Sequence, residues 1–212
     1  MIKTEILTKK SSPVYRYLEY LPRGYTSRGK SSFPLILFLH GAGERGNNIE
    51  KVKHVGLPPV LMEHSLPFVV IAPQCPLRDT WGVKDIESFL TLLLKKYNID
   101  QSRLYLTGIS MGGYATWYMA GHMPDTFAAI APICGGGNIA HAKKMIDLPV
   151  WAFHGGKDNI VPPERSKKIV DELKKLGGNV RYTVYPDTGH DSWTRTYNNP
   201  ELYKWFLEHR RT

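Results

Sequence analysis

The residues best suited to chemistry lie in the segment Gly108-Ile109-Ser110-Met111-Gly112, which follows an apolar stretch and precedes a helical one. This is the G-x-S-x-G pattern of a serine held on a tight turn between a strand and a helix. Glycines on both sides of Ser110 remove side chains that would collide with neighbouring backbone. The pattern therefore predicts a nucleophilic serine at position 110, and a serine that only caps the following helix is the alternative.

A serine nucleophile needs a base to take its proton, and a histidine oriented by a carboxylate is the usual one. In this context the partners follow the serine in the order Asp or Glu, then His. His190 fits because it lies in a turn-rich loop, residues 187–193, after the last strand-like run. The other histidines beyond Ser110 fall at a helix end, in a lysine-rich stretch, at a strand end and at the C-terminus: His122, His141, His154 and His209.

Asp158 is the predicted carboxylate partner of His190, because residues 154–162 directly follow a strand-like run. Its alternative role is to form the turn there. The other aspartates are less suited, because two flank the histidine too closely in sequence and two precede strands: Asp187, Asp191, Asp147 and Asp125.

An ester or amide carbonyl also needs two amide donors for the negative charge that develops on its oxygen. We expect one from Met111, the residue after the serine, and the other from Ala42. Ala42 lies in the glycine-rich segment 40–46, where the backbone can approach a ligand closely. His40 is expected to brace this loop. Three further residues are candidate substrate contacts, because they follow another strand end or the predicted base: Gln74, Trp81 and Trp193. For the two tryptophans, packing against the protein is the alternative.

The elements that must position these residues alternate between strand-like and helix-like patterns. Short apolar or β-branched runs predict strands at 14–21, 35–39, 68–72, 104–107, 128–132, 150–154 and 180–185. Amphipathic runs predict helices at 83–97, 111–121, 163–176 and 200–210, with Ile169, Leu173 and Leu176 on the buried side of the third. The alternation predicts an α/β fold with a mostly parallel sheet, helices on both faces, and a ligand site beyond the carboxyl ends of the strands.

Composition is that of a globular protein, with 42% hydrophobic and 22% charged residues, and 212 residues suit one domain spanning 1–212. The formal net charge is +9, but the lysines are scattered in pairs, so we expect no nucleic-acid partner. The N-terminal residues contain no signal-peptide core, and no apolar run is long enough to cross a membrane. These features predict a cytoplasmic protein with no membrane partner.

Two cysteines, Cys75 and Cys134, are too few for a disulfide framework and match no metal-binding spacing. We therefore expect free thiols in a reducing compartment and no metal site.

Taken together, these residues resemble the α/β-hydrolase superfamily, and within it the compact esterases grouped with dienelactone-hydrolase-like, feruloyl-esterase-like and predicted-peptidase sequences. The similarity covers nearly the whole chain and rests on residues 17–25, 39–46, 72–76, 106–113 and 189–193. The resemblance implies a sheet of about eight strands, a Ser110-Asp158-His190 triad and ester hydrolysis without a cofactor. Dienelactone hydrolases proper have a cysteine where this chain has Ser110.

The expected function is hydrolysis of short-acyl or aryl carboxylic esters, including feruloyl-like esters, through an acyl-enzyme. Only residues 133–149 separate two predicted strands where many relatives insert a lid, so we expect an open site with no large lid. A serine peptidase or amidase of the same fold is the first alternative. A non-catalytic binding protein is the second, and it would require a disrupted triad.

Overall fold

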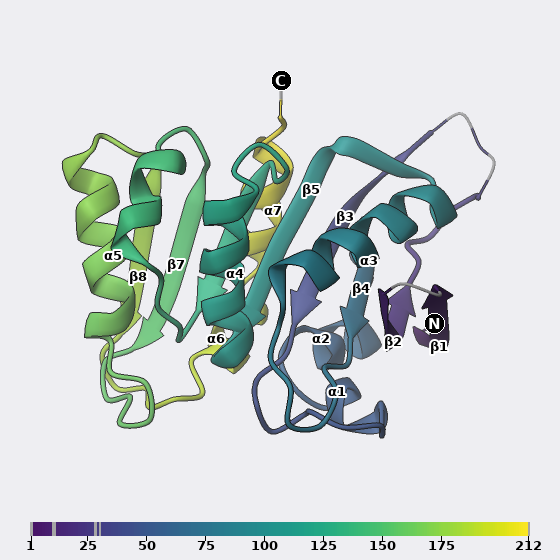
Figure 1. The fold of residues 1–212 in the computed structure, drawn as a ribbon, viewed down its shortest axis with the longest axis horizontal. Helices are drawn as coiled ribbons and strands as arrows, with labels where there is room; N and C mark the ends of the chain where they lie inside the picture. The colour runs from purple at the N-terminus through teal and green to yellow at the C-terminus, as the bar shows by residue number, and fades with distance from the viewer. Residues whose placement is uncertain (1, 10–11, 28, 30, 212) are drawn as a thin grey trace.

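The computed structural model describes residues 2–9, 12–27, 29 and 31–211, and its central feature is one eight-stranded sheet (Figure 1). The strand order is β1-β2-β4-β3-β5-β6-β7-β8. Strands β4, β3 and β5 to β8 run parallel, while β1 and β2 pair antiparallel at one edge. The bounds are β1 Ile2–Lys9, β2 Ser12–Tyr20, β3 Phe33–Leu39, β4 Val69–Pro73, β5 Ile99–Ile109, β6 Ala129–Ile133, β7 Val150–Gly155 and β8 Val180–Tyr185. The predicted mostly parallel sheet is confirmed, and β1 is an additional edge strand that we did not predict.

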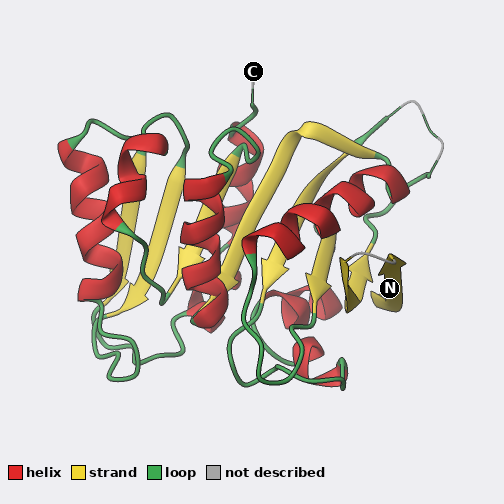
Figure 2. Ribbon diagram, in the orientation of Figure 1, coloured by secondary structure: helices red, strands yellow, loops and turns green. Residues whose placement is uncertain are grey.

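Helices cover both faces of this sheet (Figure 2). One face carries α3 (Val83–Lys96), α4 (Met111–His122), α5 (Glu164–Lys175) and the 3₁₀ helix η1 (Ile139–Lys144). The other carries α1 (Glu50–Lys53), α2 (Leu57–Glu63), α6 (Trp193–Tyr197) and α7 (Pro200–Glu208). The four predicted helices are present. Among the described residues, the additional helices α1, α2, α6 and η1 are too short for hydrophobic periodicity to reveal them.

One hydrophobic core lies on each face of the sheet, and β3 contributes side chains to both cores. Leu35, Leu37 and Leu39 belong to the core under α3, α4 and α5. Ile36 and Phe38 belong to the core under α1, α2, α6 and α7. Since successive side chains of a strand point to opposite faces, a strand covered on both sides is apolar throughout.

One prediction within α5 was wrong. Leu176 was expected on the buried side of this helix but is 38% exposed, whereas Ile169 and Leu173 are fully buried. The helix ends at Lys175, and Gly177 adopts a φ of 77° there, as in a glycine-terminated helix. Leu176 therefore lies in the terminating turn and not on the helix stripe.

The segment between β6 and β7 contains only η1, so it forms no large lid over the carboxyl ends of the strands. At those ends lie the loops after β3, β4, β5, β7 and β8, which carry the residues singled out from the sequence. The expectation of an uncapped α/β sheet is confirmed for the part of the chain that the structure describes.

Candidate functional site

Ser110 is the single residue between the end of β5 and the start of α4, and its backbone angles are φ 52° and ψ −114°. Such a backbone conformation is costly for a residue with a side chain, and such strain is commonly found at functional sites. The Ser110 amide donates to the Ile133 carbonyl at 3.0 Å, which holds the turn against β6. A Cβ added at Gly108 or Gly112 would collide with backbone atoms, including the Leu39 carbonyl oxygen beside Gly112. The close approach of three chain segments therefore requires both glycines.

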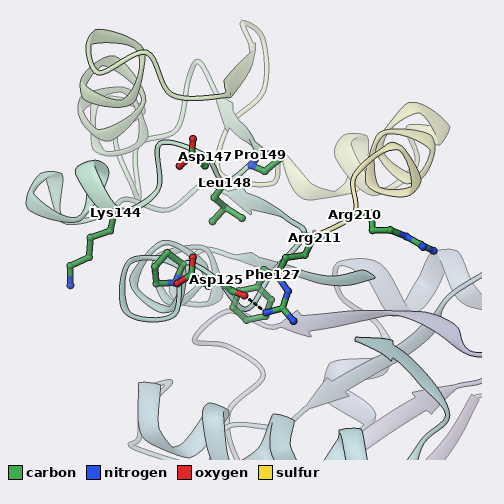
Figure 3. Close-up of a pocket in the computed structure, with 10 residues that line it drawn as sticks. Asp125, Phe127, Lys144, Asp147, Leu148, Pro149, Arg210 and Arg211 are labelled. Carbon is green, nitrogen blue, oxygen red and sulfur yellow. Dashed lines mark hydrogen bonds between the residues drawn. The ribbon is translucent and has the colours of Figure 1, made fainter. Parts of the chain in front are cut away.

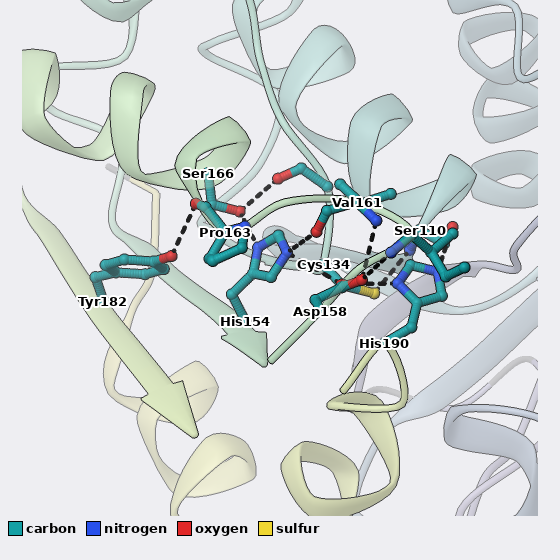
Figure 4. Close-up of polar contacts among 11 residues, drawn as sticks. Ser110, Cys134, His154, Asp158, Val161, Pro163, Ser166, Tyr182 and His190 are labelled. Carbon is teal, nitrogen blue, oxygen red and sulfur yellow. Dashed lines mark hydrogen bonds and ion pairs between the residues drawn. The ribbon is translucent and has the colours of Figure 1, made fainter. Parts of the chain in front are cut away.

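Ser110, His190 and Asp158 form one hydrogen-bonded chain across three loops (Figure 4). His190 Nε2 lies 3.0 Å from Ser110 Oγ, and His190 Nδ1 lies 2.7 Å from Asp158 Oδ2. Because the ionised carboxylate only accepts hydrogen bonds, Nδ1 carries a proton and Nε2 can accept one from the serine. The arrangement can thus move a proton from the serine hydroxyl to an oriented imidazole.

The carboxylate of Asp158 is buried, and its two oxygens have separate partners. Oδ1 accepts hydrogen bonds from the amides of Ile160 and Val161, both at 2.9 Å. Oδ2 faces His190. Burial raises the pKa of Asp158, but the hydrogen bonds from His190, Val161 and Ile160 together lower it below its ordinary value. Asp158 is therefore ionised at neutral pH.

A second buried histidine, His154, adjoins the same carboxylate, although from the sequence it was placed only at a strand end. Its Nε2 lies 2.8 Å from the Val161 carbonyl oxygen and 3.2 Å from Asp158 Oδ2, and its Nδ1 lies 2.7 Å from Ser166 Oγ. Both oxygens beside Nε2 are acceptors, so this nitrogen carries a proton. Burial lowers the pKa of His154, against the effect of Val161 and Asp158. A neutral His154 thus connects α5 to the loop that holds Asp158. Its position at the end of β7, close to Asp158 in the sequence, was the only sign in the sequence that it lies at this site.

The other histidines make contacts elsewhere. His122 Nδ1 lies 2.8 Å from the Tyr118 carbonyl oxygen, and its ring packs edge-on against His141. His209 Nδ1 lies 2.7 Å from the Trp205 carbonyl oxygen.

The other aspartates also lie outside the Ser110–His190 pair. Asp187 is exposed and pairs with Lys157 at 3.4 Å, and Asp191 accepts from the Thr194 amide. Asp125 and Asp147 line a cavity of about 480 Å³ with Arg210 and Arg211 (Figure 3). That cavity adjoins the residues that precede β6 and β7. It therefore lies at the amino ends of the parallel strands, whereas Ser110 lies at their carboxyl ends.

The loop after β3 passes directly beside Ser110. A Cβ built at Gly41 would lie 3.6 Å from the Ser110 Cβ. His40 is fully buried and accepts at Nε2 from the Cys75 amide at 2.9 Å, so its Nδ1 donates to the Gly41 carbonyl at 2.6 Å. Burial lowers the pKa of His40 to about 4, which keeps the imidazole neutral. These contacts agree with the expected bracing role.

Gln74, a predicted substrate contact, makes its observed hydrogen bonds to the protein backbone. Its side chain is buried, and its Nε2 donates to the carbonyls of Glu44 and Asn48, both at 2.8 Å. Gln74 therefore holds the loop after β3 from behind and does not line the cavity at Ser110.

A cavity of about 480 Å³ opens at Ser110 between the start of α3 and α4. Trp81, Met111, Tyr114 and Tyr118 line it, so its wall is mainly apolar and aromatic. The Trp81 indole donates to the His40 carbonyl at 3.0 Å, which links this wall to the loop after β3. Trp193 lies outside this cavity and packs edge-on against His190, with ring centroids 5.4 Å apart.

Both cysteines are free and buried. Burial raises the pKa of each thiol to about 12, so neither is a thiolate at neutral pH. Cys134 Sγ accepts from the Ser110 amide at 3.3 Å and thereby supports the turn.

The residues that the structure describes also bear on membrane and metal binding. No helix there is long and apolar enough to span a bilayer. No group of three or more His, Cys, Asp or Glu there is arranged to hold a metal ion.

The uncapped, mostly parallel sheet, the strained serine after β5 and the carboxylate–histidine pair together define an α/β-hydrolase. Residues 76–202 match the Dienelactone hydrolase family, more than half of the chain. The chain belongs to this family.

Similar proteins carry esterase names. The chain is 30% identical over 180 residues to the bifunctional acetylxylan esterase/xylanase XynS20E of Neocallimastix patriciarum, covering 81% of this chain and 26% of that protein. It is 32% identical over 123 residues to feruloyl esterase B of Neurospora crassa, covering 51% and 40%. The chain thus spans about a quarter to two fifths of the length of these curated relatives.

A solved thermostable esterase superimposes with a TM-score of 0.85 at 33% identity, covering 99% of this chain and 63% of that one. A ferulic acid esterase superimposes with a TM-score of 0.75 at 16% identity, which supports the fold alone.

Proposed function

We propose that this protein is a serine carboxylesterase that hydrolyses short-acyl or aryl esters through an acyl-enzyme on Ser110. The observation that carries the proposal is the continuous relay from Ser110 Oγ through His190 to Asp158, with distances of 3.0 and 2.7 Å. Membership of the Dienelactone hydrolase family and the esterase names of similar proteins support the same reaction. We also propose that residues 1–212 act as one catalytic domain.

In the first half of the proposed reaction, Ser110 Oγ attacks the ester carbonyl while His190 Nε2 takes the hydroxyl proton. The tetrahedral intermediate collapses when His190 returns that proton to the departing alkoxide, which leaves as an alcohol. Asp158 remains ionised and stabilises the transient imidazolium. In the second half water replaces the alcohol, and the carboxylic acid is released with Ser110 restored.

The backbone amides of Met111 and Ala42 are assigned as the donors that stabilise the negative charge developing on the carbonyl oxygen. Met111 is the first residue of α4, where backbone amides lack helical acceptors and the helix dipole favours negative charge. Ala42 follows Gly41, which packs beside the Ser110 side chain, and this supports the assignment. Removing one such donor typically reduces turnover by about 100- to 1,000-fold.

The cavity beside Ser110 is assigned to the acyl group. Its wall of Trp81, Met111, Tyr114 and Tyr118 suits an apolar or aromatic acid. The names of an acetylxylan esterase and a feruloyl esterase among similar proteins support small and aromatic acyl groups.

The test is hydrolysis of p-nitrophenyl acetate, p-nitrophenyl butyrate and methyl ferulate by the wild-type protein and by Ser110→Ala. We expect wild-type turnover and a loss of roughly 10⁴-fold or more in the variant, with an unchanged circular dichroism spectrum. A fluorophosphonate probe should label only the wild-type protein. Inactivity of the wild type on all three esters, without labelling of Ser110, would refute the proposal.

A further inference from the structure

Another cavity lies next to His190, the proposed base, and the reaction described above gives this cavity no role. It has a volume of about 340 Å³ and lies between α2 and α6; we call it the α2–α6 cavity. Pro59, Val60 and Trp193 supply apolar wall. The polar groups come from His54, Glu63, Asp191, Thr194 and Asn198. Its volume falls in the range of small-molecule sites, and an aromatic ring beside a few polar groups is a typical lining of such a site.

The position of this cavity relates it directly to His190. Asp191 is the next residue in the chain, and the Trp193 ring packs edge-on against the His190 ring at 5.4 Å. Trp193 packs against the core under α2 and α6, whereas Trp81 of the Ser110 cavity belongs to the core under α3 and α4. The helices that line the two cavities, α3 and α4 for one and α2 and α6 for the other, therefore lie on opposite faces of the sheet (Figure 1).

The chemistry of ester cleavage distinguishes these two sides. His190 Nε2 must protonate the leaving oxygen, so that oxygen lies within hydrogen-bond distance of the imidazole, roughly 3 Å. The acyl carbon is bonded to Ser110 Oγ, and the cavity lined by Ser110 and Met111 is the space available to its substituent. The alcohol part must then extend on the His190 side, where Trp193 and the α2–α6 cavity lie.

We propose that the α2–α6 cavity binds the alcohol part of the ester, and that this alcohol is neutral and polyhydroxylated, such as a sugar residue. The proposal rests on the esterase function above. Hydroxyl groups can donate to the carboxylates of Glu63 and Asp191 and bond to the Asn198 amide. The C–H face of a sugar ring can pack on the indole of Trp193. Two carboxylates against a single histidine, His54, in one small cavity disfavour an anionic alcohol, although the whole chain has a formal net charge of +9.

The test compares three ferulic acid esters that share one acyl group: the methyl ester, the ester of a neutral pentose and the ester of a uronic acid. In the wild type we expect the highest kcat/KM for the pentose ester. In Glu63→Ala the pentose-to-methyl ratio of kcat/KM should fall about ten-fold, the usual order for a lost hydrogen bond to a charged group. In Glu63→Gln the uronate-to-pentose ratio should rise, because the variant removes charge but keeps polarity.

Glu208→Ala is the matched control, because Glu208 is an exposed glutamate at the end of α7 and does not line the α2–α6 cavity. It should keep all wild-type ratios. Unchanged ratios in both Glu63 variants, in an enzyme active on methyl ferulate, would overturn the alcohol site and leave the esterase proposal standing.

A binding experiment separates the two proposals further, because it needs no turnover. The free pentose, titrated into Ser110→Ala, should shift the Trp193 indole resonance in an NMR spectrum, and Glu63→Ala should weaken the response. No shift at high pentose concentration would refute the alcohol site whatever the activity. Wild-type inactivity on all three esters would refute the esterase function, and with it the assignment of this cavity to an ester alcohol.

Discussion

At the scale of single residues, Asp158 shows how one buried carboxylate can serve both a loop and a histidine. The amides of Ile160 and Val161 hold Oδ1 and thereby fix the plane of the carboxylate. Oδ2 accepts from His190 at 2.7 Å and also lies 3.2 Å from His154 Nε2, so His190 can rotate only with the loss of its hydrogen bond. The same contacts that lower the pKa of Asp158 thus orient the imidazole towards Ser110.

Replacing Asp158 with Asn should destabilise the protein in a pH-dependent way. A carboxylate whose pKa is lowered by folding contributes stability above its unfolded pKa, and that contribution is lost as the pH falls through its folded pKa. The wild type should therefore exceed Asp158→Asn in free energy of unfolding by about 2 kcal/mol at pH 7. The difference should shrink below roughly pH 4.

Urea unfolding at pH 7, 5, 4 and 3 measures this difference. The control is Asp187→Asn, which alters an exposed residue of the neighbouring loop and should change little at any pH. A difference for Asp158→Asn that stays constant down to pH 3 would contradict the expectation.

His154→Gln tests whether the second histidine positions Asp158. Glutamine can keep a donor towards the Val161 carbonyl, but it cannot reproduce the contact with Ser166 at the same time. We expect kcat to fall roughly ten-fold with KM nearly unchanged, because His154 is buried and does not line the Ser110 cavity.

His154→Phe, which has no donor, should lose more activity, so that Gln shows partial rescue. Steady-state kinetics with p-nitrophenyl butyrate measures both parameters. Equal losses in the two variants, or a change in KM alone, would indicate that His154 only fills space.

At the scale of elements, the β5–α4 turn depends on close packing of backbone against backbone. Gly112 faces the Leu39 carbonyl oxygen of β3, and Gly108 faces the Gly112 carbonyl oxygen. Such contacts leave no room for a methyl group, because backbone atoms cannot rotate away as a flexible side chain can. The turn is therefore specified by the ends of β3 and β5 as well as by its own residues.

Gly112→Ala should destabilise the protein by about 3 kcal/mol and lower activity, because the added methyl must displace the end of β3 or the start of α4. Thermal unfolding and ester hydrolysis measure the two effects. Gly43→Ala is the matched control, since a Cβ there meets nothing within 4 Å and its φ is not positive. Equal stability of the two variants would show that the turn relaxes without cost.

At the scale of the whole molecule, the sheet separates two cavities, one lined by Ser110 and the other by Asp191, the residue after His190. The cavity under Trp81 and Tyr118 is shallow enough that Tyr118 is 41% exposed. The β6–β7 segment supplies no lid that could enclose a long chain. An open cavity offers few contacts to carbon atoms far from the carbonyl, so long acyl chains gain little by binding.

Activity should therefore fall as the acyl chain lengthens. We expect kcat/KM for p-nitrophenyl octanoate to be roughly ten-fold or more below that for the butyrate, measured at concentrations below micelle formation. Methyl ferulate should remain a substrate, since an aromatic ring can pack on Trp81 and Tyr114. A rate that rises steadily from acetate to octanoate would contradict an open acyl site.

The sequence by itself determined the order of the long helices and parallel strands and the loops in which the candidate residues lie. Apolar runs such as residues 35–39 are local signals of strands covered on both faces. Since parallel strands place their carboxyl ends at one edge, the sequence also predicts that Ser110, Asp158 and His190 meet. The structure brings these three within hydrogen-bonding distance, while their catalytic roles remain our proposal.

Only the tertiary structure decided what the remaining polar residues contact. Gln74 holds the carbonyls of Glu44 and Asn48, and His154 meets Ser166 on a helix, although no local pattern pairs these positions. The α2–α6 cavity likewise joins residues from two segments far apart in the chain, and both helices are too short to be predicted from periodicity. Local patterns predict elements because they depend on neighbouring residues, whereas cavities and buried hydrogen bonds depend on how distant segments pack.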